Sequence, residues 1–152
     1  MTETSDTPGH EDPFNLSRFV RAQENIYPEA LAELRDGQKR THWMWFIFPQ
    51  IDGLGYSSTA RHYAIKSEDE ARHYLNHPVL GRRLLECAEA VLALAGRSAS
   101  EIFGYPDDLK LKSSMTLFAH VSSPGSVFAR VIDKYFDGIQ DAQTLVLLEQ
   151  HR

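Results

Sequence analysis

Apolar residues recur along most of the chain at the three- and four-residue steps that are typical of short amphipathic helices. The clearest case follows Pro78, where the apolar positions run from Leu80 to Leu94 and Gly96 follows as a stop. Ser67 with Glu70 and Ser98 with Glu101 each form a capping-box pattern before such a stripe. Further stripes begin at cap or proline signals, namely Asp12-Pro13, Pro28, Ser57 or Ser58, Pro106, Ser123-Pro124 and Asp141.

Residues 43–48 (WMWFIF) are apolar on every side, so periodicity alone does not separate a buried strand from a buried helix. Pro49 ends the segment in either case. Because a lone strand would have no partner in this chain, we predict a helix at the centre of a helical bundle. The predicted fold is therefore all-α: a compact single domain over residues 12–152, with about eight to ten short helices.

Composition supports an ordinary globular domain, because 42% of the 152 residues are hydrophobic and 24% are charged. Residues 1–11 are polar and acidic without the pattern of a secretory signal, and we predict a disordered tail there. The rest of the chain is close to neutral, which argues against a nucleic-acid partner. The longest unbroken apolar run is residues 43–48, which is too short to span a membrane.

Two long aromatic-rich motifs, residues 39–50 (KRTHWMWFIFPQ) and 103–118 (FGYPDDLKLKSSMTLF), are unusual in their combination. Together with residues 63–65 (YAI), 77–81 (HPVLG) and 133–136 (DKYF), they resemble the bacterial domain-of-unknown-function family 1810 over nearly the whole chain. Thr41 stands where this family is expected to have Ser, and both residues supply a hydroxyl for a helix cap.

The resemblance implies a small, mostly helical, cytoplasmic domain and brings no catalytic residues with it. Some members carry the label calpastatin, which belongs to a long, disordered and repetitive calpain inhibitor. The present chain is short, aromatic and globular in composition, so that label gives no guide to its function.

The candidate site joins the two long motifs, which lie about seventy positions apart. It combines fixed cations, hydroxyl donors and aromatic faces, the groups that a pocket for a small anion needs. We predict as its lining Lys39, Arg40, His42, Trp45, Gln50, Tyr56, Arg61, Lys110, Lys112, Ser113 and Ser114. The alternative is that the tryptophans are core residues, the lysines are solvated and the serines satisfy nearby backbone groups.

The functional hypothesis is a domain that binds, or acts on, a small phosphorylated or carboxylated ligand. His42 is the candidate acid or base, because the unperturbed pKa of histidine lies near neutrality. Whether the chain is an enzyme stays open, and the alternative is a protein–protein interaction module without catalysis. Neither a cofactor nor a membrane partner is expected.

Other chemistries find weaker support in the sequence. Ser113 or Ser114 could act as a nucleophile, but the chain has no Gly-x-Ser-x-Gly elbow. Glu70, His73 and His77 have a spacing that could share a helix face, yet Pro78 should end that helix near Asn76 and turn His77 away. We therefore expect no metal site. The single cysteine, Cys87, lies on an apolar stripe and is predicted to be a core residue.

Overall fold

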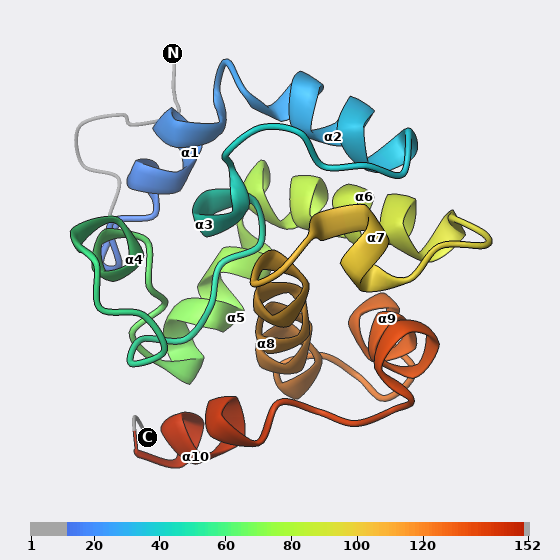
Figure 1. Cartoon of the computed structure of the whole chain (residues 1–152). Helices are drawn as coiled ribbons and strands as arrows, with labels where there is room; N and C mark the ends of the chain where they lie inside the picture. The colour runs from blue at the N-terminus through green and yellow to red at the C-terminus, as the bar shows by residue number, and fades with distance from the viewer. Residues whose placement is uncertain (1–11, 151–152) are drawn as a thin grey trace.

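The computed structural model describes residues 12–150, and ten helices make up that part of the chain (Figure 1). The predicted all-α class is confirmed. The acidic segment 1–11 lies outside the described residues. In chain order the helices are α1 (Ser17–Gln23), α2 (Tyr27–Arg35), α3 (Met44–Ile47), α4 (Ser58–His62), α5 (Glu68–Asn76), α6 (Leu80–Ala93), α7 (Ala99–Phe103), α8 (Asp107–His120), α9 (Val127–Phe136) and α10 (Ala142–Gln150).

Helix α8 runs through the middle of the molecule and packs against α5, α7, α9 and α10 (Figure 1). It begins at Asp107, directly after Pro106, and carries two acids in its first turn, where the helix dipole favours them. Residues 113–118 are all buried, so no clean apolar stripe distinguishes one face. Hydroxyls are tolerated in this core because those of Ser113 and Thr116 donate to backbone carbonyls one turn earlier.

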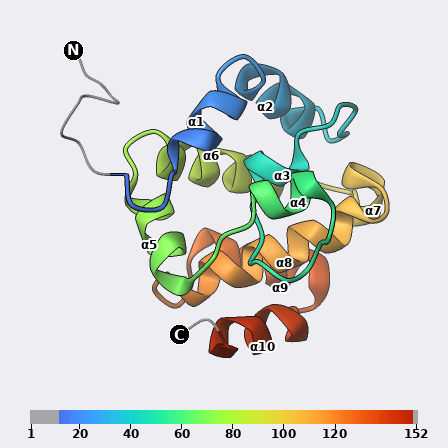
Figure 2. The same cartoon turned by 90° about the vertical axis from the view of Figure 1, so that its left-hand side faces the viewer.

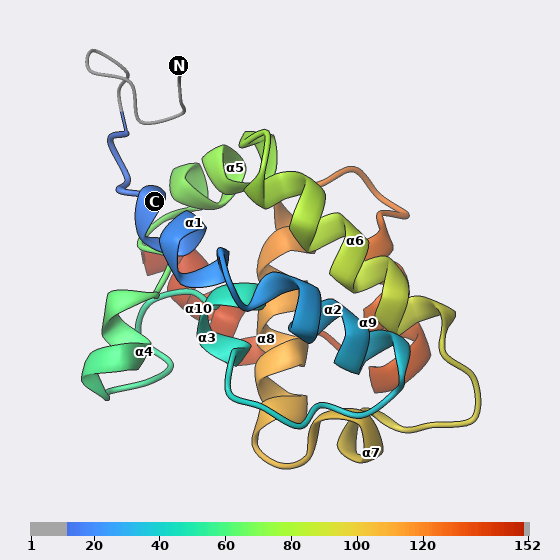
Figure 3. The same cartoon turned by 90° about the horizontal axis from the view of Figure 1, so that it is seen from above.

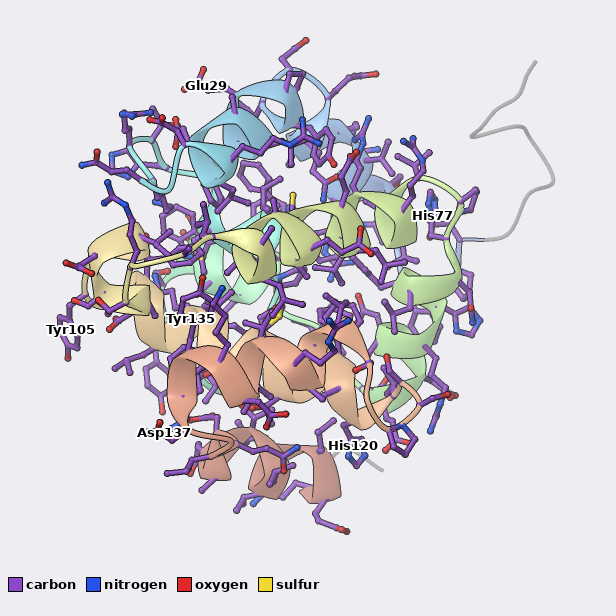
Figure 4. The ribbon with its side chains drawn as sticks, turned by 90° about the vertical axis from the view of Figure 1, so that its right-hand side faces the viewer. Glu29, His77, Tyr105, His120, Tyr135 and Asp137 are labelled. Carbon is purple, nitrogen blue, oxygen red and sulfur yellow. The ribbon has the colours of Figure 1, made fainter. Side chains whose placement is uncertain are left out.

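Helix α6 buries the stripe that its spacing predicts and packs against α2, α5 and α9; Figure 3 shows it continuing from α5. It ends at Ala93, three residues before Gly96. Side chains of α9 cap its last carbonyls: Lys134 Nζ donates to Leu92 O at 2.7 Å, and the Tyr135 hydroxyl donates to Val91 O at 2.6 Å (Figure 4). Val91 O also accepts from Leu94 N at 3.3 Å, so α9 adds side-chain donors to the carbonyls at the end of α6.

The apolar segment 43–48 contains a helix, α3, as predicted. Its expected burial on every side is wrong, because Trp45 and Phe46 are only half-buried, whereas Trp43, Met44 and Phe48 are fully buried. The physical reason is that α8 occupies the centre of the bundle. Helix α3 therefore lies at the edge of the core and keeps one side toward solvent.

Two predicted helix starts are displaced toward the C-terminus. Asp12-Pro13 does not open a helix directly: Asn15 has a φ of +52°, and α1 begins at Ser17, with the Asp12 carboxylate accepting from Leu16 N at 2.7 Å and Ser17 N at 3.0 Å. Ser126, and not Ser123, caps α9. By contrast, the capping box of Ser98 and Glu101 is formed in full.

The chain between α3 and α4 is fixed at its base by a parallel bridge between Ile51 and Ile65. Asp52 N donates to Ile65 O, and Ile65 N donates to Gln50 O, both at 2.8 Å. Gly53, at a φ of +110°, packs on Leu147 of α10, and a Cβ there would lie 2.9 Å from the Leu147 side chain. Position 53 therefore needs glycine, because its φ is positive and because a Cβ would collide with Leu147.

Candidate functional site

The two long motifs meet at the first turn of α8. Lys39 Nζ lies 2.8 Å from Asp107 Oδ2, and Lys110 Nζ lies 3.5 Å from Asp107 Oδ1. The backbone of the first motif is tied to α7 as well, because Lys39 N donates to Ile102 O at 2.7 Å. One carboxylate therefore holds the first lysine of each motif.

Aromatic rings occupy a further face of both ammonium groups. Lys39 Nζ lies 5.1 Å from the centre of the Trp43 ring, and Lys110 Nζ lies 5.0 Å from that of Trp45. The Lys39 side chain is only 7% exposed. Asp107 is thus shared between the two ammonium groups, and the arrangement ties the segment before α3 to α8.

Glu33 of α2 organises the same segment, and sequence analysis did not identify it. Its buried carboxylate accepts from Arg40 N at 2.8 Å, from Thr41 N at 3.1 Å and Oγ1 at 2.7 Å, and from Trp43 Nε1 at 2.9 Å. Burial alone would raise the pKa of Glu33, but these hydrogen bonds lower it to about 2. The sequence does carry a sign of this role, since Glu33 interrupts the apolar face formed by Ala30, Leu31 and Leu34.

Lys112 does not join Lys110. Its ammonium lies 6.0 Å from the Phe136 ring of α9, because residues two apart on a helix point in different directions. The Ser113 hydroxyl donates to Leu109 O. Ser114 Oγ is fully buried and, among the described residues, is the one buried side-chain polar atom without a hydrogen-bond partner.

The remaining predicted residues are spread over the surface near α3 and α4. Arg40 forms a surface ion pair with Asp36, and His42 is exposed. Trp45 and Gln50 line a depression of about 20 Å³ beside residues 53–55, which has room for about one water molecule. Tyr56 projects into solvent with 78% of its surface exposed.

A much larger open recess, of about 420 Å³, lies between the segment entering α1 and the end of α4. These elements lie together on the left of Figure 1, the side that faces the reader in Figure 2. Arg61, one of the predicted binding residues, lines the recess. Sequence analysis missed its other lining residues, which are Pro13, Phe14, Asn15, Arg18, His62, Lys66 and Glu70.

The inner wall of this recess is built on the buried Arg18 of α1, whose side chain is 6% exposed. All five N–H groups of its guanidinium donate to protein acceptors. Nε donates to His62 O at 2.7 Å, Nη1 to Phe14 O at 2.6 Å and Asn15 O at 2.9 Å, and Nη2 to Ala64 O at 2.9 Å and Glu70 Oε2 at 2.8 Å. Arg18 thus joins α1, α4 and α5 around one point.

Glu70 completes this inner wall from α5. Its Oε1 accepts from Lys66 N at 2.7 Å, so the predicted capping box with Ser67 is only half formed: Ser67 Oγ accepts from Glu70 N, while the Glu70 carboxylate turns toward Arg18. The charges of Arg18 and Glu70 cancel each other at the base of the recess.

The rim of the recess keeps an excess of positive charge. Among the described residues, no acidic side chain pairs with the exposed Arg61 guanidinium. Lys66 Nζ donates to Arg61 O at 2.9 Å and lies 3.8 Å from Asp52 Oδ1. The imidazole of His62 also lines the recess. A concave surface with this balance attracts anions.

Comparison with known proteins agrees with the motifs. Residues 13–148 match the family described as "Protein of unknown function (DUF1810)". The chain belongs to the DUF1810 family. The crystal structure of the conserved hypothetical protein Rv1873 from Mycobacterium tuberculosis is similar to it, with a TM-score of 0.89 and 52% sequence identity over 91% of this chain and 99% of that one. No curated protein shows significant similarity to the chain.

The described part of this DUF1810 chain does not bring metal-binding side chains together. Glu70 pairs with Arg18, His73 contacts Asp69 O, and His77 Nδ1 accepts from Val79 N. Within residues 12–150, no three His, Cys, Asp or Glu side chains are placed to hold a metal ion. Cys87 is a buried core residue as predicted, and burial raises the pKa of its thiol to about 12. None of the described helices is long and apolar enough to cross a bilayer.

Proposed function

We propose that this DUF1810 chain binds a small organic anion in the recess between α1 and α4. The observation that carries the proposal is the combination of size and charge: about 420 Å³ of open space whose rim bears Arg61 and Lys66. Pockets that take organic ligands measure about 300–1,000 Å³. The ligand class is the one that the sequence suggested, whereas the place differs from the predicted centre around Lys39 and Lys110.

The pair of lysines at the first turn of α8 is a weaker candidate for the same role. Asp107 lies within ion-pair distance of both ammonium groups, and a Trp ring covers each of them. A ligand anion would have to displace that carboxylate, which is part of the first turn of α8. At the recess, the guanidinium of Arg61 is available without such a displacement.

The backbone that shapes the recess is held in advance of any ligand. Six hydrogen bonds, five of Arg18 and a further one from Lys66 N to Glu70, fix the three segments that carry Phe14, Arg61 and Lys66. Prearranged groups lose little conformational entropy on binding, which favours affinity. The exposed large apolar side chains that an interaction module would use, such as Tyr105 (Figure 4), Tyr56 and Ile139, come from separate segments of the chain.

Calorimetric titration of the full chain with inorganic phosphate at low ionic strength tests the proposal. Arg61→Ala should weaken binding about tenfold or more, because a hydrogen bond to a charged group contributes about 1.5–3 kcal/mol. Arg130→Ala, which removes an exposed arginine of α9, is the matched control and should leave the affinity unchanged. Equal binding by wild type and Arg61→Ala, or a loss confined to Lys110→Ala, would overturn the proposal.

A further inference from the structure

We propose that the ligand of this recess is an amphiphilic organic anion, in which the charged group is joined directly to a flat apolar body. The inference rests on the proposed function and specifies its ligand class. It starts from the two different walls of the recess: basic side chains come from the end of α4 and the turn into α5, and Pro13 with Phe14 comes from the segment entering α1.

The inner wall supplies no free donor for the charged group. Every guanidinium N–H of Arg18 is used by the protein, and both Glu70 oxygens already accept hydrogen bonds. The guanidinium and carboxylate charges cancel there as well. An anionic group therefore finds its partners at the rim, where Arg61 is exposed and unpaired among the described residues, with Lys66 beside it.

Space remains once the charged group is placed at the rim. A recess of about 420 Å³ is in the size range of pockets for organic molecules, well beyond the space that a single ion needs. Pro13 and Phe14, which come from the segment entering α1, contribute mostly apolar surface to the lining of the recess. Asn15, which also lines this side, uses its Oδ1 to accept from Ser17 Oγ. A flat apolar group packed on Pro13 and Phe14 would remove apolar surface from water on both partners.

The apolar wall is held in place by its own contacts. The Phe14 ring packs against the His73 ring, with centroids 4.8 Å apart. Asn15 adopts a φ of +52°, a left-handed conformation uncommon outside glycine, and both its carbonyl and that of Phe14 accept from Arg18 Nη1. Unusual backbone conformations of this kind persist where surrounding contacts fix them and are frequent at ligand-binding sites. Here the conformation holds Phe14 at the edge of the recess.

The test compares phenyl phosphate with inorganic phosphate and with phenol on the full chain, by calorimetry at one pH and ionic strength. Phenyl phosphate should bind about tenfold more tightly than inorganic phosphate, because its ring adds an aromatic contact and buries apolar surface. Phenol should bind far more weakly than either, because it lacks the charge. Intermolecular NOEs should connect the phenyl protons of the ligand to the Phe14 ring.

Two variants measure how much the apolar wall and the basic wall each contribute to the affinity for phenyl phosphate. Phe14→Ala should weaken phenyl phosphate about tenfold and change inorganic phosphate less than twofold, whereas Arg61→Ala should weaken both. A melting curve of Phe14→Ala reports whether the variant is folded. If it is not, the comparison of the three ligands and the NOEs on the unmodified chain still decide the question.

The outcomes separate this inference from the proposed function. If inorganic phosphate and phenyl phosphate bind equally through Arg61, the proposed anion site stands and the amphiphilic ligand is rejected. If phenol matches phenyl phosphate, the charged group is not recognised and the inference is also rejected. If none of the three binds at the recess, both proposals fail.

Discussion

Two buried glutamates, Glu33 and Glu70, each hold a neighbouring segment in place by accepting hydrogen bonds. Glu33 does so for the segment before α3, and Glu70 does so at the base of the recess. The Glu33 carboxylate accepts from two backbone N–H groups and two side chains of the segment before α3, and the Glu70 carboxylate accepts from Lys66 N and from Arg18. A carboxylate that is buried with several donors is favoured in its charged form, which is why the pKa of Glu33 falls although burial opposes ionisation. Glu33 interrupts an apolar face and Glu70 belongs to a capping-box pattern, so the sequence marks their positions but not their partners.

Glu33 should give the domain a measurable stability loss in acid. Its folded-state pKa of about 2 lies below the ordinary value of 4.5 that applies to the unfolded chain, so its contribution is complete above pH 4.5 and is lost as the pH falls toward 2. The difference corresponds to about 3 kcal/mol. Urea unfolding at several pH values should show this loss in the wild type. A Glu33→Gln variant should be less stable at pH 7 and lack that part of the pH dependence.

The control for this experiment is Glu24→Gln, which removes an exposed carboxylate next to α1 and should retain the wild-type profile. If Glu33→Gln were as stable as wild type at pH 7, the four hydrogen bonds described for its carboxylate would not contribute to folding.

Arg18→Ala should be among the most destabilising single changes at the recess. It removes the side-chain donor from four backbone carbonyls, of which Asn15 O keeps the bond from the backbone N of residue 18, and it leaves the buried Glu70 charge without its partner. Breaking a buried ion pair from one side costs about 3–5 kcal/mol. Denaturant unfolding measures the cost, and Arg21→Ala, an exposed arginine of the same helix, is the comparison. A loss below about 1 kcal/mol would contradict the central place given to Arg18.

At the level of elements, the helices were predictable because their signals are local. Periodicity and caps located α5, α6, α7 and α8, each of which depends on residues a few positions apart. The errors occurred where non-local packing decides the outcome. Helix α3 was expected at the centre of the bundle, but the longer α8 takes that place, and the segment before α1 bends at Asn15 to reach Arg18.

The corrected start of α9 can be tested by its cap. Ser126 Oγ accepts from Ala129 N at 3.3 Å, so Ser126→Ala should destabilise the domain by about 1 kcal/mol. Ser123→Ala, the position that the sequence favoured, should change stability by less than about 0.5 kcal/mol. The two melting temperatures should therefore differ. A larger loss of stability for Ser123→Ala than for Ser126→Ala would instead indicate that α9 begins after Ser123.

For the whole molecule, the sequence predicted one contact of the candidate site and missed the recess. Lys39 and Lys110 do come together, yet helical geometry turns Lys112 toward α9. The recess forms where the segment before α1 meets the end of α4, joined mainly through backbone carbonyls that accept from Arg18. Every residue has a carbonyl, so no sequence pattern shows which ones will converge.

Mapping amide chemical shifts during a phosphate titration tests most directly whether the recess of this DUF1810 chain is an anion site. Binding at the recess should cause saturable chemical-shift changes at residues 14–18 and 61–66, with little change at the first turn of α8. Saturable changes centred on Lys39 and Lys110 instead, or no saturable change anywhere, would contradict it.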